Sequence, residues 1–75
     1  MSLQQFVTQF ADAIEADPAA IQSETEFKAL ENWDSLCALS VIAMVDDAYQ
    51  VTLGGEDLES SKTVGDLWAL IGTRR

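Results

Sequence analysis

The sequence contains no histidine, and this absence removes several kinds of active site at once. Ser–His and Cys–His nucleophile pairs need an imidazole as general base, and most metal sites of proteins use histidine or several cysteines. Cys37 is the only cysteine, so no internal disulfide can form. A phosphate-binding glycine loop is missing as well. The sequence therefore predicts no catalytic residue and no metal site, and an enzyme is the least favoured class.

Basic residues are almost as scarce, with four against thirteen acids and a net charge of −9. Lys28 is the only cation between Met1 and Ser61. Such an acidic surface repels nucleic acid and anionic membranes and attracts basic proteins. We expect no signal peptide, and the longest unbroken apolar run, Val41 to Val45, is far too short to span a bilayer. We therefore expect a cytoplasmic protein that binds basic partners, without nucleic-acid binding and without membrane insertion.

What the sequence does contain is enough for a single small domain, residues 1–75. Apolar residues make up 48% of the chain, too many for a disordered segment. A chain of this length buries only about 60% of its unfolded surface, so the core is thin. The apolar spacing indicates four helical segments, no convincing strand and no internal repeat. We therefore predict an all-α fold, a small four-helix bundle with three longer helices, one short helix and a long first loop.

The first helix is predicted from Leu3 to Glu15, because its apolar residues recur at i, i+3, i+4, i+7 and i+11. Ser2 is a suitable N-cap, and Pro18 is expected to end the helix. The long connection from Asp17 to Trp33 follows. Three apolar side chains are expected to hold it on the core: Ile21, Phe27 and Leu30.

The C-terminal third of the chain predicts a short helix and a longer one. Two apolar side chains are expected to enter the core ahead of them, Val51 and Leu53. Gly54-Gly55 reads as a turn, and "EDLES" is long enough for a single helical turn. "TVGDLWALI" is the last helix, in which Thr63 and Asp66 have the spacing of a capping box and Gly72 is the expected end.

A central helix that follows Asp34 and runs to about Tyr49 is apolar on two sides. The predicted core side holds Ala38, Val41, Ile42, Val45 and Tyr49. The opposite side, here called the outer face, holds Leu36, Leu39, Ser40, Ala43 and Asp47, with Met44 beside it and Asp46 in the last turn. Either the helix is buried nearly all round, or the outer face is a docking surface for a partner helix or loop. We favour docking, because so short a chain has few elements left to cover a second face.

Ser35 stands at the start of this helix, where serine and aspartate are both preferred N-caps worth about 1 kcal/mol. Asp34 or Ser35 therefore serves as the cap. Ser35 is a poor candidate for a nucleophile, since no histidine or nearby lysine is present to activate it. Its hydroxyl could instead accept a phosphodiester, because the amides and the positive dipole end of a helix N-terminus stabilise an anion.

"WDSLCALSVIAMVDDAYQVTL" followed by "TVGDLWALI" resembles the acyl carrier protein family over nearly the whole chain. The core motif is Asp34-Ser35-Leu36. The resemblance implies a 4′-phosphopantetheine cofactor attached to Ser35, whose terminal thiol carries acyl groups as thioesters. It also implies that Asp34 assists modification and that Leu36 contacts partners. The implied partners of this monomer are a phosphopantetheinyl transferase and acyl-transfer and synthase enzymes with basic docking patches.

The sequence also departs from the family pattern. Carrier proteins usually have Leu-Gly-x before the motif, whereas Leu30 is followed here by Glu31-Asn32-Trp33. Trp33 is expected either to pack beside the motif or to join the docking surface. Cys37 and Ser40 stand where members of the fatty-acid type often have acids, which favours a specialised pathway over bulk fatty-acid biosynthesis. A carrier of polyketide or aminoacyl cargo and an unmodified acidic adaptor remain as alternatives.

Overall fold

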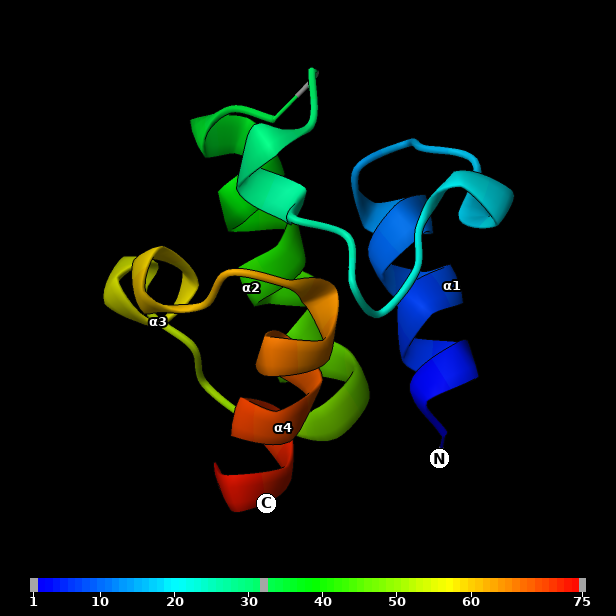
Figure 1. Ribbon diagram of the computed structural model, residues 1–75. Coiled ribbons are helices and arrows are strands. Elements are labelled where there is room, and N and C mark those ends of the chain that lie inside the picture. The colour runs from blue at the N-terminus through cyan, green and yellow to red at the C-terminus, as the bar shows by residue number, and fades with distance from the viewer. Residues whose placement is uncertain (1, 32, 75) are drawn as a thin grey trace.

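The computed structural model describes residues 2–31 and 33–74, and Met1, Asn32 and Arg75 lie outside them. Within these ranges the chain is helical and contains no strand, which confirms the predicted all-α fold (Figure 1). The helices are α1 (Leu3–Ala13), α2 (Ser35–Tyr49), α3 (Gly55–Ser60) and α4 (Val64–Arg74), with two 3₁₀ turns, η1 (Pro18–Ala20) and η2 (Phe27–Ala29).

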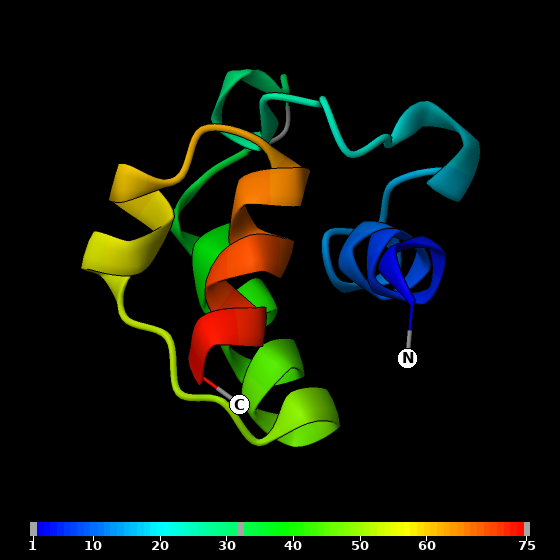
Figure 2. The ribbon, with the colours of Figure 1, turned by 60° about the horizontal axis from the view of Figure 1, so that its bottom comes forward.

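The three longer helices enclose the core. α1 contacts both α2 and α4, and the short α3 lies on the other side of this pair (Figures 1 and 2). The aromatic centre of the core consists of Phe6, Phe10 and Phe27, all without exposed surface, with Tyr49 and Trp68 packed against Phe6. The sequence placed Tyr49 on the core face of its helix by helical spacing, and it placed Phe27 on the core as an apolar residue of the long connection.

α1 begins as predicted and ends earlier than predicted. Ser2 and Gln5 form a capping box in which each side chain accepts a hydrogen bond from the other's backbone N–H, both at 3.2 Å. At the other end Glu15 has φ +58°, and the N–H of Ala16 donates to the carbonyl of Ala11 at 2.8 Å. This is a Schellman motif, which usually uses glycine at the left-handed position. The helix therefore stops at Ala13, and Pro18 begins η1 instead of ending α1.

The long connection between α1 and α2 lies on the core, as its apolar residues predict. Ile21 and Phe27 are buried, and two backbone hydrogen bonds tie the connection to the start of α4. The N–H groups of Val64 and Gly65 donate to the carbonyls of Thr25 and Ser23 at 3.0 and 2.8 Å. A Cβ atom on Gly65 would lie 3.0 Å from the Ser23 carbonyl oxygen, so only glycine lets these two segments approach so closely.

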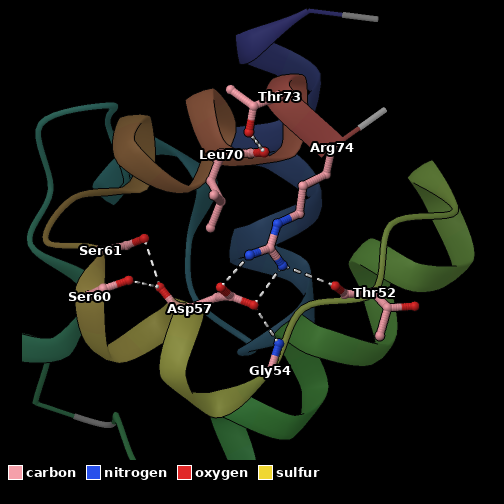
Figure 3. Close-up of polar contacts among 8 residues, drawn as sticks. All are labelled: Thr52, Gly54, Asp57, Ser60, Ser61, Leu70, Thr73 and Arg74. Carbon is pink, nitrogen blue, oxygen red and sulfur yellow. Dashed lines mark hydrogen bonds and ion pairs between the residues drawn. The ribbon is translucent and has the colours of Figure 1, made fainter.

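Glycine positions were interpreted less well than apolar ones. Gly54 and Gly55 do not form a separate turn, since Gly54 is the N-cap of α3 and Gly55 its first residue. Gly72 does not end α4, which continues to Arg74. One network joins these two segments, and in it the Arg74 guanidinium donates to both carboxylate oxygens of Asp57 at 2.7 and 2.8 Å (Figure 3). Asp57 also accepts from the Gly54 N–H, so it joins the start of α3 to the last turn of α4.

This network predicts an acid-dependent contribution to stability. The Arg74 guanidinium, followed by the Gly54 N–H, holds the pKa of Asp57 below its usual value. Since the folded-state pKa is the lower one, the contribution is present above the unfolded pKa of about 4 and is lost as the pH falls through the folded value. We expect Arg74→Met to lower the melting temperature modestly near neutral pH, with the difference from wild type shrinking in acid.

Thermal melts followed by circular dichroism across the acid range test this expectation. Lys62→Met is the matched control, because it removes a cation whose ion pair with Glu26 is long, 3.8 Å, and well exposed. A melting-temperature difference between Arg74→Met and wild type that is independent of pH would contradict the assigned role of Asp57.

Candidate functional site

The N-terminus of α2 is capped by Asp34, not by Ser35. The Asp34 Oδ1 atom accepts a hydrogen bond from the Cys37 N–H at 2.9 Å, and the backbone of Asp34 is extended, as an N-cap requires. This bond, followed by one with the Cys37 side chain, keeps the pKa of Asp34 below its ordinary value. The sequence left open whether Asp34 or Ser35 is the N-cap, and the structure shows that it is Asp34. The Ser35 side chain is therefore not needed for capping.

Ser35 is the first residue of α2, and its side chain is exposed. Within residues 2–31 and 33–74, its hydroxyl makes no hydrogen bond with another protein group. A serine in this place adds nothing evident to the fold, because the neighbouring Asp34 already occupies the N–H of Cys37. The hydroxyl is therefore available for chemistry at a helix end that favours an attached anion.

A hollow of about 540 Å³ adjoins Ser35 between α2 and α3. Its lining comes from four segments of the chain: Lys28, Trp33, Asp34, Ser35, Ala38, Gly55, Leu58 and Glu59. The apolar members are Trp33, Ala38 and Leu58, while charged groups stand beside them. The sequence prediction named Asp34, Ser35 and Trp33 but missed Lys28 and the α3 residues, because no sequence spacing places η2 and α3 beside the start of α2.

Trp33 lies half-buried at this site and packs on the core. Its ring is stacked parallel to that of Phe10, with centroids 6.1 Å apart, and meets the ring of Phe27 edge-on at 5.0 Å. Of the two interpretations offered by the sequence, the structure shows the packing one. A contact of its exposed part with partners stays a prediction.

The outer face of α2 is open. Leu36 and Leu39 are 70% and 62% exposed. They are the only exposed large apolar residues in the part of the chain that the structure describes. Ala43, Asp46 and Asp47 are exposed too, whereas Ser40 and Met44 are half-buried. On the opposite side Val41, Val45 and Tyr49 are buried, with Ala38 and Ile42 half-buried. A helix buried nearly all round, the alternative reading of its two apolar sides, is therefore wrong.

α1 forms a second wall beside the outer face, which the sequence analysis did not foresee. Two shallow hollows, of about 510 and 340 Å³, run between the helices. Asp12 and Ala13 of α1 line both of them, and Glu15 lines the second. No pattern within α1 pointed to this role, because it depends on how α1 packs against α2. The wall adds two carboxylates to an apolar surface that is already edged by acids.

Neither a metal site nor a membrane span is found among the described residues. No group of three or more histidine, cysteine, aspartate or glutamate side chains there could hold a metal ion. No helix in the same ranges has the length and apolarity to cross a membrane. The features that do stand out are the available serine, its capping neighbour and the two-sided helix that begins with them.

These features have counterparts among known proteins. The family described as "Phosphopantetheine attachment site" matches residues 4–71. An acyl carrier protein of Exiguobacterium sp. is 33% identical over 64 residues, which cover 85% of this chain and 81% of that protein. The fold, the site and both matches agree on one class, the small helical domains that bear a phosphopantetheine arm. The chain belongs to the acyl carrier protein family, and its cofactor is covalent 4′-phosphopantetheine.

The residues at the start of α2 fit such a group. An attached phosphodiester needs a hydroxyl that is exposed and not required by the fold, and Ser35 meets both conditions. The arm beyond the phosphate contains methyl groups and amides, and the adjoining hollow offers apolar and polar surface to both kinds of group.

Proposed function

We propose that Ser35 carries the 4′-phosphopantetheine group and that residues 1–75 act as a single carrier domain. When bound, the group supplies a flexible arm whose terminal thiol holds acyl cargo as a thioester. The protein delivers this cargo to biosynthetic enzymes. The observation that carries the proposal lies at the start of α2, where Asp34 caps the helix and the exposed Ser35 hydroxyl makes no hydrogen bond with the other residues that the structure describes.

Each residue at this helix end has a separate task. Ser35 provides the oxygen through which the phosphodiester is attached. Asp34 holds the first turn in shape through the Cys37 N–H, so that the Ser35 oxygen is presented on a fixed backbone. The dipole of α2 favours the negative charge that modification adds, although the Asp34 carboxylate opposes part of this effect.

Intact mass measurement tests the attachment. The purified chain is incubated with coenzyme A and a broad-specificity phosphopantetheinyl transferase, and the product is digested to locate the added mass. We expect a gain of one phosphopantetheine unit, on the peptide that contains Ser35. A chain that gains no mass with an active transferase would instead support the unmodified adaptor. Added mass on a peptide without Ser35 would show that another residue is the attachment site.

The outer face of α2 is proposed as the surface that partner enzymes recognise. Leu36 and Leu39 present apolar area, and acids surround it on both helices, including Asp12, Asp46 and Asp47. A partner with a basic patch around an apolar contact complements such a surface. The expected partners are the transferase and the acyl-transfer and synthase enzymes of the pathway. The neutral Cys37 and Ser40 support a specialised pathway.

Removing acids from this face should slow association with a basic partner. We expect Asp46→Asn combined with Asp47→Asn to lower the association rate for the transferase several-fold at low salt, because charges at the rim of an interface mainly steer encounter. The effect should diminish as salt screens the charges. Stopped-flow or surface-based binding kinetics measure it.

The matched control removes the same amount of charge elsewhere. Asp17→Asn with Glu24→Gln changes two exposed acids on the connection between α1 and α2, and neither lines the hollows beside α2. Asparagine is still able to cap η1 in place of Asp17. Equal slowing by the two double variants would show that net charge acts as a whole and that the outer face has no special part.

A further inference from the structure

Lys28 occupies an unusual position for a cation in this chain. Of the cations in residues 2–31 and 33–74, Lys62 pairs with the Glu26 carboxylate and Arg74 with the Asp57 carboxylate. Lys28 has no carboxylate partner in the same ranges, although the chain contains thirteen acids. Its ammonium group donates instead to a main-chain oxygen, the carbonyl of Glu59, at 2.5 Å.

Lys28 is one of the residues that line the hollow beside Ser35. Lys28 is the second residue of η2, and its side chain reaches across to α3. Lys28 and Ser35 both line the hollow between α2 and α3. Two carboxylates, those of Asp34 and Glu59, belong to residues of the same lining. A phosphodiester attached to Ser35 would therefore enter a place where Lys28 is the single cation among the lining residues.

We propose that Lys28 is a positioning residue for the prosthetic group and forms an ion pair with the phosphodiester on Ser35. The inference rests on the proposed attachment at Ser35. An ammonium has three donors, and the carbonyl of Glu59 uses one of them, so two are left for phosphate oxygens. Lysine binds phosphate as a point charge and needs no fixed fork geometry. In this role Lys28 offsets the repulsion that Asp34 and Glu59 exert on the phosphodiester.

The pairing has a consequence for the arm. A phosphodiester held by Lys28 is drawn toward η2 and α3, on the side of the hollow, and away from Leu36 at the outer face. The lysine thereby links the attached group to the connection between α1 and α2, which is itself tied to α4. The alternative is a purely structural role, in which Lys28 only joins η2 to α3 through the Glu59 carbonyl and makes no contact with the attached group.

A comparison of unmodified and modified protein separates these two roles. Wild type, Lys28→Met, Lys28→Arg and Lys62→Met are each melted before and after loading, with the loaded state verified by mass. We expect the change in melting temperature upon loading to be lower in Lys28→Met than in wild type by roughly 1 to 5 °C at low salt, the size of a surface ion pair in so small a domain. Lys28→Arg restores the wild-type change, and Lys62→Met leaves it unaltered.

If Lys28 only supports the fold, Lys28→Met lowers the melting temperature of the unmodified and modified proteins by the same amount, and the proposal is overturned. A wild-type chain that takes up no mass at Ser35 refutes the proposed function itself, and the role of Lys28 falls with it. A wild-type chain that loads normally while Lys28 shows no coupling refutes the role of Lys28 alone.

A second measurement needs no variant and applies even if Lys28→Met resists modification. The carbon signals next to the ammonium groups of Lys28 and Lys62 are followed by NMR in wild-type protein before and after loading. We expect the Lys28 signal to move upon loading, with Lys62 as the internal reference, and the difference to vanish at about 1 M salt, where the screening length falls to about 3 Å. A Lys28 signal that does not move overturns the proposal.

Discussion

Val45→Asp is expected to unfold the protein, whereas Leu36→Asp on the same helix leaves it folded. Val45 has no exposed surface and packs in the shared core of the bundle, while the Leu36 side chain is 70% exposed. An unpaired charge in a core costs several kcal/mol, and small domains have a total stability of only about 5–15 kcal/mol. At Leu36 the introduced carboxylate stays in water, so the cost should be below about 1 kcal/mol.

Far-ultraviolet circular dichroism and urea unfolding measure both variants. Leu36→Asp should keep the helical spectrum and the unfolding midpoint close to those of wild type, yet be modified more slowly by the transferase, because a charge replaces an apolar contact. Leu36→Ala separates loss of the apolar side chain from gain of a charge. If Leu36→Asp melted as readily as Val45→Asp, the side chain would be part of the core and the open outer face would be wrong.

Ser35→Ala is expected to abolish loading completely and to change the stability by less than about 1 kcal/mol. The first expectation follows from removal of the proposed attachment oxygen. The second follows from the cap, since Asp34 and not Ser35 accepts the Cys37 N–H. Asp34→Ala should affect stability more than loading. We expect its free energy of unfolding to fall by roughly 0.5–2 kcal/mol because the cap is missing, and its loading to be slower but not abolished.

Intact mass and urea unfolding of the two variants, side by side with wild type, measure both quantities. Ser60→Ala is a suitable control, because it removes another exposed serine hydroxyl, at the end of α3, from a residue that lines none of the hollows beside α2. Full loading of Ser35→Ala would exclude Ser35 as the attachment residue. Strong destabilisation by Ser35→Ala would instead show that this serine, and not Asp34, holds the helix start.

Helical periodicity was the most reliable guide to the fold. The stripes of α1, α2 and α4 gave the correct core residues, since a residue's face on a helix depends only on its position in the chain. The N-cap role of Ser2 and the capping box of Thr63 with Asp66 were predicted for the same reason, because their bonds join residues three apart. The resemblance of the Asp34-Ser35-Leu36 motif gave the family, which the comparisons confirm.

Helix ends were predicted less well. α1 stops before Glu15 because this residue adopts a left-handed backbone, from which the N–H of Ala16 bonds back to the carbonyl of Ala11, although glutamate does not favour that conformation. α4 passes through Gly72 because Arg74 is held by Asp57 on another helix. A helix end is decided by small energy differences, and one contact from a distant segment is enough to shift it.

The sequence by itself determined the helical class, the core faces, the acidic character and the serine at the head of α2. These properties are local, because they depend on residue types and spacings of a few positions. The tertiary structure alone decided that Asp34 is the cap, that Trp33 packs on Phe10, that α1 walls the outer face, and that Lys28 shares a hollow with Ser35. The packing of Trp33 on Phe10 and of α1 beside the outer face joins segments far apart in the chain, and the hollow that Lys28 and Ser35 share is closed by residues of α3. They depend on how the helices and loops pack, and no local pattern encodes that geometry.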